Sequence, residues 1–269
     1  MSFSYFIPVI HLGPVKSNKI SIDLPIKDIE KLIIGSSSVF EVVRYIIGDG
    51  EVIYESKLFL EYKNKIWINK EAEKFEWTNH KDIFSYVETQ VNQIEGKGLT
   101  SSFLPSFYVF YTNKYSKSYI SCGNWKYGNI RVVMQMAAFG KWVDGYPAIN
   151  IDRESKTTYS IAIINPYVKS SKYTIEIKGL NVIHNVIVKS QSVEVIDLAD
   201  IILKNKWTGQ IYVYGKQRSI IYVINHNIDN LYDITTIEHS DPFRAELNYM
   251  PRFQYIRSRL HSFFKRLSL

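Results

Sequence analysis

The sequence predicts an all-β protein made of two tandem antiparallel β-sandwich modules and closed by a C-terminal amphipathic helix. Three observations support this fold class. Tyrosine and phenylalanine, which favour strands, contribute 20 and 14 of the 269 residues. Short apolar runs rich in β-branched residues recur along the chain, and glycine- or proline-containing turns separate them. The order of these runs is similar in the two halves of the chain.

The first module is expected over residues 1–150. Extended segments at 3–10 and 19–24 precede two strands around Gly48-Asp49-Gly50, a sequence that favours a hairpin because Asp and Gly tolerate positive φ. Residues 28–34 fit a helical turn or a strand equally well. Further strands are expected at 56–62, 65–69, 82–93, 107–113 and 118–121.

The second module is expected over residues 151–243. Strands lie on both sides of a turn at Asn165-Pro166, and a further strand pair ends in the sequence VEVIDL. Residues 211–214 and 220–224 alternate across a glycine-containing turn, which predicts a β-hairpin. Aligned by eye, segments of the two halves repeat at a spacing of about 114 to 119 residues, so we interpret the modules as repeats of one unit. One continuous sandwich or barrel is the alternative.

The second half resembles a small β-sandwich family typified by the sensory rhodopsin transducer. The similar features are the strand that ends at Asn165-Pro166, the strand pair that closes on residues 193–198, and the strand whose end carries His226. This resemblance implies an immunoglobulin-like sandwich that binds partners or small ligands and does not catalyse a reaction.

Composition and charge narrow the class of protein. The lone Cys122 excludes a disulfide framework and a multi-cysteine zinc site within the chain. The N-terminus lacks the early positive charge and cleavage pattern of a signal peptide, and no apolar run approaches the about 18 residues of a membrane span. We therefore expect a soluble, cytoplasmic protein. No acid follows Glu246, so most of the net charge of +7 lies in the C-terminal tail.

Polar side chains gather at the predicted strand ends of the second module. His226 ends one strand, and Glu238, His239 and Asp241 follow the end of the next. Imidazole and carboxylate groups bind zinc and other divalent ions, so His226, His239 and Asp241 form a candidate metal site, and Glu238 completes a polar pocket. The alternative is ordinary surface hydrogen bonding, with Asp241-Pro242 as turn chemistry. No other cofactor is expected.

A second candidate site lies in the connecting segment 122–150, which we interpret as an ordered loop. Aromatic rings can cover the apolar side of a sugar, and charged groups can bond its hydroxyls. The predicted ligand-binding residues are Trp125, Tyr127, Arg131, Trp142 and Tyr146. The same rings could instead seal the interface between the two sandwiches.

The tail, residues 244–269, is predicted to form a basic amphipathic helix, because apolar residues recur at three- and four-residue intervals opposite a cationic face. Such a helix can pack on its own protein, lie on an anionic membrane or bind an acidic partner. Nucleic acid is disfavoured because no basic stripe continues outside the tail. The cationic residues are Arg252, Arg257, Arg259, Lys265 and Arg266.

The sequence contains no catalytic motif such as G-x-S-x-G, H-E-x-x-H or a phosphate-binding glycine loop. We therefore expect a non-enzymatic binding or assembly protein. A carbohydrate is the preferred ligand, a protein is the other partner considered, and homo-oligomers would form through sheet edges or the tail. The alternatives are a metal-assisted hydrolase that uses the His/Asp pocket, and a membrane-surface structural protein anchored by the C-terminal helix.

Overall fold

The structure is a computed structural model. It describes residues 2–8, 11–12, 15–16, 19–23, 38–63, 66–68, 74–78, 85–96, 107–112, 117–122, 142–215, 220–227 and 234–239. These residues form antiparallel sheets and one short helix, α3 (Leu198–Ile201), which confirms the all-β class. In this part of the chain, no helix has the length and apolar character needed to cross a bilayer. The helix predicted over 244–269 lies outside the described residues.

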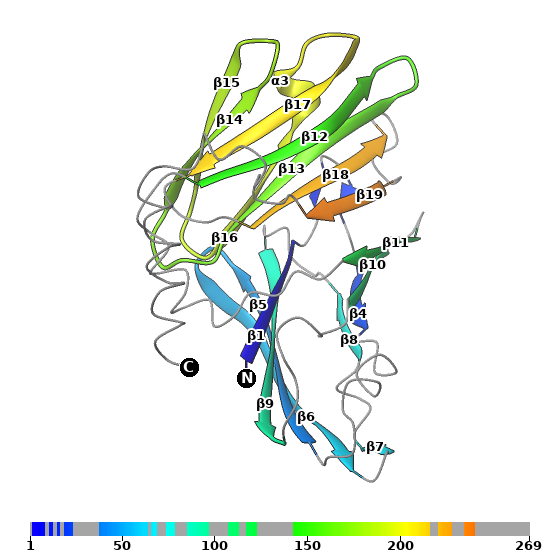
Figure 1. The fold of residues 1–269 in the computed structure, drawn as a ribbon, viewed down its shortest axis with the longest axis vertical. Coiled ribbons are helices and arrows are strands. Elements are labelled where there is room, and N and C mark those ends of the chain that lie inside the picture. The colour runs from blue at the N-terminus through cyan, green and yellow to red at the C-terminus, as the bar shows by residue number, and fades with distance from the viewer. Residues whose placement is uncertain are drawn as a thin grey trace, which may run out of the picture.

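The first large sheet has the strand order β1-β9-β5-β6-β7 (Figure 1). The predicted hairpin around Gly48-Asp49-Gly50 is confirmed, because the two strands pair across it and Asp49 and Gly50 have φ values of 52° and 85°. The strands are β1 (Ser2–Pro8), β5 (Ser38–Gly48), β6 (Glu51–Lys63), β7 (Ile66–Ile68) and β9 (Ser85–Glu95).

A second sheet, of order β11-β10-β4-β8, packs against the first. The ring of Tyr54 on β6 lies 6.1 Å from that of Phe75 and 5.3 Å from that of Trp77, both on β8. The buried guanidinium of Arg44 lies 5.3 Å from the Phe75 ring centroid. The strands are β4 (Lys19–Asp23), β8 (Lys74–Thr78), β10 (Phe107–Thr112) and β11 (Lys117–Cys122), and β2 (His11–Leu12) pairs separately with β3 (Val15–Lys16).

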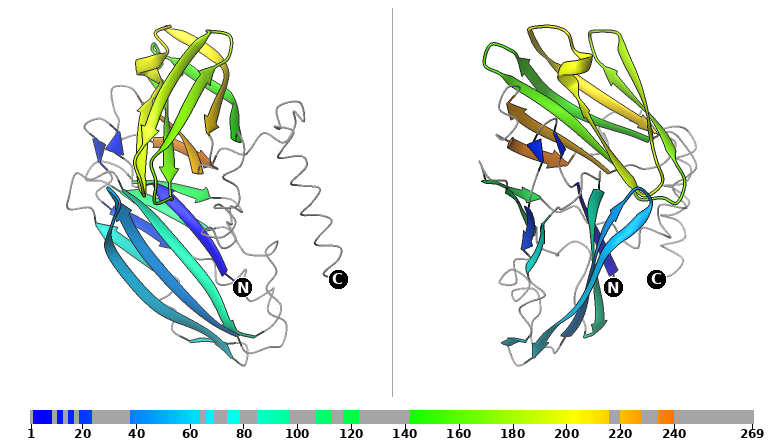
Figure 2. Two further views of the ribbon diagram at one scale, coloured as in Figure 1. Left: turned by 90° about the vertical axis from the view of Figure 1, so that its left-hand side faces the viewer. Right: turned by 180° about the vertical axis from the view of Figure 1, so that it is seen from behind.

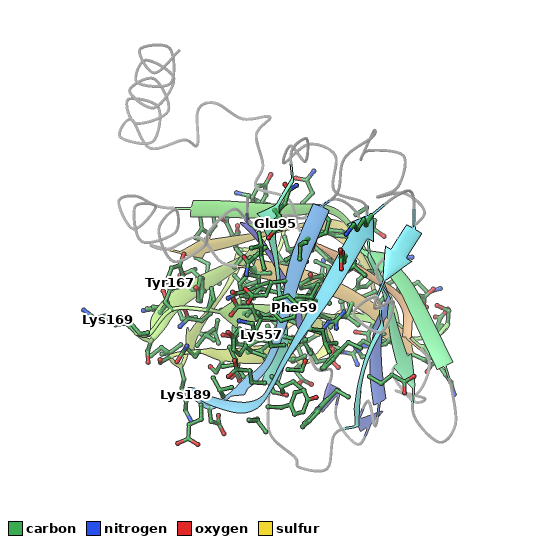
Figure 3. The ribbon with its side chains drawn as sticks, turned by 90° about the horizontal axis from the view of Figure 1, so that it is seen from below. Lys57, Phe59, Glu95, Tyr167, Lys169 and Lys189 are labelled. Atoms are coloured by element: carbon green, nitrogen blue, oxygen red, sulfur yellow. The ribbon has the colours of Figure 1, made fainter. Side chains whose placement is uncertain are left out.

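The opposite face of the first sheet is partly open to solvent. Lys57 and Phe59 of β6 lie on it (Figure 3). Lys57 forms an ion pair with Glu41, and its Nζ lies 5.7 Å from the centroid of the Phe59 ring. Asn92 donates a second hydrogen bond to Glu41 at 3.1 Å. These contacts lower the pKa of Glu41, chiefly through the hydrogen bond from Lys57.

The described residues between 142 and 239 form a sheet that folds over into two layers (Figures 1 and 2). One layer has the order β15-β14-β17-β12, and in the other β13 pairs with β16 and β18, and β18 with β19. The hairpin of β12 and β13 joins the layers and pairs only at Asp152 and Thr157. The strands are β12 (Trp142–Asp152), β13 (Thr157–Asn165), β14 (Ser171–Ile177), β15 (Val182–Val188), β16 (Ser192–Asp197), β17 (Lys206–Gly215), β18 (Ile220–Asn227) and β19 (Ile234–His239).

The two layers enclose a core of branched aliphatic side chains. Alternate residues of each strand point inward, as the burial of β14 shows, where every second residue from Ser171 is buried. The arrangement is that of a β-sandwich. The core includes Ile149, Ile151, Ile161, Ile163, Tyr173, Ile175, Trp207, Ile211, Val213, Ile221 and Val223.

The predicted hairpin of residues 211–214 and 220–224 is wrong, although both strands exist. β17 pairs with β12 and β14, whereas β18 pairs with β13 and β19, so the two strands lie in opposite layers. The physical reason is burial on both faces, because Ile220 through Ile224 are all buried. A two-stranded hairpin with one wet face could not cover such a continuous apolar run.

The outer face of the β13–β18 layer rests on the first part of the chain. Tyr222 of β18 and Phe6 of β1 are both buried, and the Tyr222 hydroxyl donates to the Phe6 carbonyl at 2.5 Å. The amide of Gly50 donates to the carbonyl of Gln191 at 3.3 Å. Figure 3 shows Lys189, which lies two residues before Gln191, close to the β5–β6 turn. The two parts therefore share an interface.

The strand pairing of the two halves differs. The strand predicted to match β5 is β13, and the strand predicted to match β10 is β18. β13 and β18 pair along eight residues, from Thr157 to Ile164 on β13, whereas β5 and β10 lie in different sheets. The described strands therefore show no common pairing pattern for a repeated unit.

Candidate functional site

The structure separates the two histidines predicted to bind metal. His226 lies within β18 opposite Ile234, and His239 lies opposite Tyr222. The two positions are four residues apart along the strand, or about 13 Å, too far for a shared ion. Glu238 lies opposite Val223, and Asp241 is outside the described residues. Among the described residues, no three His, Cys, Asp or Glu side chains are grouped to hold a metal ion.

His226 instead belongs to a buried polar cluster with Ser160 and Asp197. Its ring Nε2 lies 2.8 Å from Ser160 Oγ and 4.0 Å from Asp197 Oδ2, and its Nδ1 lies 3.2 Å from the carbonyl oxygen of Asn227. A carbonyl can only accept, so we assign the proton of the neutral ring to Nδ1. Nε2 then accepts a hydrogen bond from the Ser160 hydroxyl.

This cluster differs from a catalytic triad in two ways. In a triad, the serine and the carboxylate bind opposite nitrogens of the imidazole, whereas here both face Nε2. In addition, Ser160 is 0% exposed and His226 is 1% exposed, so a substrate cannot reach the hydroxyl. Burial lowers the pKa of His226, against the opposing effects of the Asp197 carboxylate and the Asn227 carbonyl. The ring is therefore neutral near pH 7 and supports the fold.

Asp197 also fixes the start of α3. Its Oδ1 accepts hydrogen bonds from the amide of Ala199 at 2.8 Å and from Thr158 Oγ1 at 3.3 Å, which makes Asp197 the N-cap. The far end of the helix is held by Arg153, whose Nη2 donates to the carbonyls of Ala199 at 2.7 Å and Ile202 at 3.2 Å. The short helix is thus anchored to the β12–β13 hairpin at both ends.

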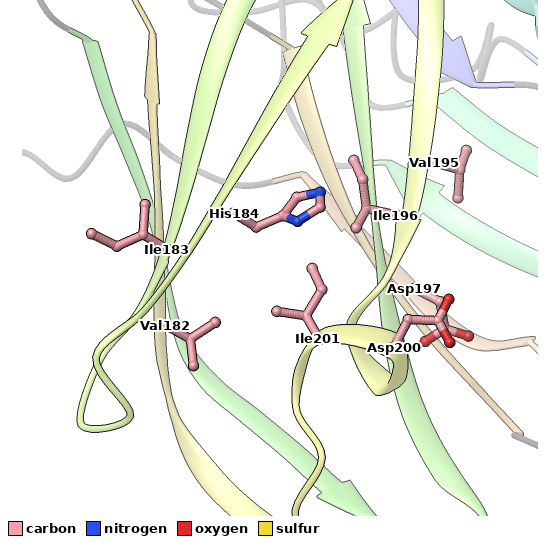
Figure 4. A pocket seen from close by; sticks show the side chains of 8 residues that line it. All are labelled: Val182, Ile183, His184, Val195, Ile196, Asp197, Asp200 and Ile201. Carbon is pink, nitrogen blue, oxygen red and sulfur yellow. The ribbon is translucent and has the colours of Figure 1, made fainter.

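A pocket of about 380 Å³ lies between β15 and the segment formed by β16 and α3 (Figure 4). His184 projects from β15 toward Ile196, and Asp197 and Asp200 come from the beginning of α3. Asp200 is exposed and His184 is partly exposed, so a ligand can reach both side chains. The lining is completed by apolar side chains from the three elements: Val182, Ile183, Val195, Ile196 and Ile201.

The predicted aromatic site is divided between strand and undescribed chain. Trp142 and Tyr146 lie in β12 and not in a loop, which corrects the interpretation of 122–150 as a loop throughout. The strand tolerates Pro147 because the register shifts there, between Tyr146 and Ile149. Tyr146 packs against the core. Trp125, Tyr127 and Arg131 lie outside the described residues, as do the cationic residues of the tail.

Aromatic and polar side chains do combine on the outer face of β14 and β17. The Tyr214 hydroxyl donates to Glu176 at 2.5 Å, and Lys178 binds the same carboxylate at 2.6 Å. Lys178 Nζ also lies 4.9 Å from the centroid of the Tyr212 ring. Tyr212 is only 7% exposed, so the ring does not offer an open platform to a sugar. This group stabilises the sheet surface.

The pocket could have been noticed from one local signal. The sequence DLAD at 197–200 places an acid three residues after an N-cap aspartate, a pattern typical of a helix start. The other wall comes from β15. The strand pair predicted to end in VEVIDL is wrong, because β15 pairs with β14 and β16 pairs with β13, so the two strands lie in different layers. No protein-family model, curated protein or solved structure matches the chain.

Proposed function

We propose that the chain is a non-enzymatic binding protein whose ligand, a carbohydrate unit, occupies the pocket between β15 and α3. The observation that carries this proposal is the composition of the pocket wall. His184, Asp197 and Asp200 line a cavity of about 380 Å³ whose other lining residues are apolar, and the two carboxylates lie together at one end of it (Figure 4). Small-molecule sites have this composition, a mostly apolar wall with a few polar groups, and volumes from about 300 Å³ upward.

The chemistry of the wall suits a molecule rich in hydroxyl groups. Ionised carboxylates accept hydrogen bonds only, so Asp197 and Asp200 select a ligand that donates several. The imidazole of His184 can donate or accept, which suits a hydroxyl that does both. Ile196 and Ile201 provide an apolar surface for the C–H face of a sugar ring. A pyranose presents this combination of hydroxyls and an apolar face.

The buried cluster supports a binding role over hydrolysis. Ser160 and His226 are inaccessible, and one carboxylate oxygen of Asp197 is engaged as the cap of α3. Ser160 and His226 therefore cannot contact a ligand in the pocket, and Asp197 is the member of the cluster that also lines it. The alternative of a metal-assisted hydrolase depended on a shared metal site of His226 and His239. The pairing of β18 with β19 places these two positions about 13 Å apart, which does not support that site.

We also propose the domain organisation and the cytoplasmic location that the sequence predicts. We keep the expectation of two immunoglobulin-like modules, over 1–150 and 151–243, but move their boundary to the start of β12 at Trp142, because β12 pairs with β17 of the second module. A basic helix over 244–269 completes the proposal. The resemblance of the second half to the sensory rhodopsin transducer family implies the same class of function, a sandwich that binds small ligands or partners. The protein acts in the cytoplasm, and the helix provides a second contact with a membrane surface or a protein.

A glycan array followed by calorimetric titration tests the proposal. We expect wild-type protein to bind at least one glycan, and Asp200→Asn and His184→Ala to weaken that binding about tenfold or more, the effect of about 1.4 kcal/mol. Glu154→Gln is the matched control, because Glu154 is an exposed carboxylate on the β12–β13 turn outside the pocket. Absence of any glycan ligand, or equal affinity of all variants, would overturn the proposal.

A further inference from the structure

β15 is an edge strand without the features that usually protect such an edge. Among the described strands it pairs with β14 alone. Its sequence, VIHNVIV, contains no Lys, Glu, Asp or Pro, and its pairing with β14 is free of bulges over all seven residues. Edge strands usually carry charges, prolines or bulges because exposed backbone groups would otherwise pair with another chain. The β15 edge is open to such pairing.

The exposed face of β15 is apolar as well. Ile183 is 64% exposed and Ile187 is 67% exposed, and both point to the outer face of the sandwich. Val182 and Val186 alternate with them and are half-buried on the inner side. A partner strand that carries two apolar side chains four residues apart would cover both isoleucines on this unprotected edge.

The sequence of β15 is complementary to itself when read in the opposite direction. With Asn185 opposite Asn185, Ile183 of one copy falls opposite Ile187 of the other, and Val182 falls opposite Val188. We infer that two copies of the chain pair through antiparallel β15 strands about a twofold axis at Asn185. This inference is independent of the proposed carbohydrate ligand. The dimer joins the β15-containing layers of two sandwiches into one continuous sheet.

The charges at the ends of the strand support a second copy as the partner. No charged residue lies within β15, so the twofold axis brings no like charges opposite one another. The exposed Lys189 follows Val188 directly, and at this register it falls opposite Asn181 of the other copy, so it also meets no like charge.

The pairing also places side chains of one copy beside the pocket of the other. A twofold axis perpendicular to the sheet keeps inner faces on the same side. Val186 of the second copy therefore lies opposite His184, and Val188 opposite Val182, along the open side of the cavity. A single strand pair is a small interface, below about 1,200 Å². We therefore expect a reversible dimer with a dissociation constant in the micromolar range.

Sedimentation velocity over a range of concentrations tests the dimer, and complementary charges test its register. Ile183→Lys alone and Ile187→Glu alone should each weaken the homodimer about tenfold or more. An equimolar mixture of the two variants should recover dimer, because the new lysine then faces the new glutamate while Ile187 faces Ile183. A mixture that stays monomeric, or single variants that dimerise like wild type, would refute this register.

Cysteine crosslinking tests the position of the axis. In a Cys122→Ser background, Asn185→Cys should form a disulfide-linked dimer on mild oxidation, since the two residues face each other across the axis. Ile187→Cys is the matched control with similar exposure. Its two copies would lie about 13 Å apart along the strands and should remain monomeric. Equal crosslinking of both variants would contradict the inference. Glycan affinity is measured on the monomeric Ile187→Glu variant, because Ile187 is not among the residues that line the pocket. This separate readout reports only on the proposed function.

Discussion

The hydroxyl of Tyr222 donates a hydrogen bond of 2.5 Å to the backbone carbonyl of Phe6, a residue 216 positions earlier in the chain. Both side chains are buried, at 2% and 1% exposure. The bond lies where β18 of the sandwich meets β1 of the first sheet. The N-terminal strand thus helps to cover one layer of the sandwich, and the two parts depend on each other for burial.

We expect Tyr222→Phe to lower the free energy of unfolding by about 1–3 kcal/mol, because it leaves the buried Phe6 carbonyl without its donor. Urea denaturation measures this change. Tyr214→Phe is the control, since its partner Glu176 is partly exposed to water and keeps its bond to Lys178. If both variants lost the same stability, the Tyr222 bond would have no special role at the interface.

Stability should fall with acidification in the range where His226 titrates in the unfolded chain. Burial lowers the pKa of His226 in the folded protein, and Asp197, at 4.0 Å, only partly opposes this effect. As pH falls below about 6.5, the unfolded chain therefore takes up a proton before the folded chain does, and the stability present above that pH is lost.

Urea titrations of wild type and His226→Gln test this pH dependence. Between about pH 7.5 and pH 5.5, the free energy of unfolding should fall less in the variant, whatever its absolute stability, because the titrating group is gone. An identical fall in both proteins would mean that other groups account for the acid sensitivity.

Ser160 should be chemically inert. It is 0% exposed and donates to a neutral imidazole that no carboxylate orients at Nδ1. A fluorophosphonate probe, followed by mass spectrometry of the digested protein, should leave Ser160 unlabelled while a serine hydrolase run alongside is labelled. Labelling that disappears in Ser160→Ala would instead favour an enzyme.

Arg153 should influence the pocket without lining it. We expect Arg153→Met to loosen α3, because the carbonyls of Ala199 and Ile202 lose their donor. Amide hydrogen exchange over 197–202 should accelerate, and glycan affinity should fall. Lys204→Met is the control, since it removes an exposed cation from the same loop. Unchanged exchange in Arg153→Met would show that Asp197 alone suffices to hold the helix.

Strands and local turns could be predicted from the sequence, but their partners could not. The turn at Asp49-Gly50 depends on residues that tolerate positive φ, so local chemistry identifies it. The partners of β17 and β18 depend on the layer that each strand joins. Because the two strands are adjacent in the chain, the sequence suggested that they form a hairpin with each other, but they lie in different layers. The unbroken apolar run from Ile220 to Ile224 is the sequence feature that indicates a strand covered on both faces, and all five residues are buried in the structure.

The candidate site shows the same limit. His226 was predicted to bind a metal, but in the structure its partner is Ser160, which lies 66 residues earlier and becomes a neighbour only through the pairing of β13 with β18. The pocket residues His184 and Asp200 come from elements that do not pair with each other. No spacing rule in a single sequence connects them.

Chemical-shift mapping of the isotope-labelled protein with the best array glycan tests the central claim most directly. The account predicts that the amide signals of residues 182–184 and 195–201 shift together and saturate with one affinity, which Asp200→Asn weakens. Shifts confined to other surfaces, such as the face that carries Tyr212 and Tyr214, or no shift at saturating glycan, would contradict a carbohydrate site between β15 and α3.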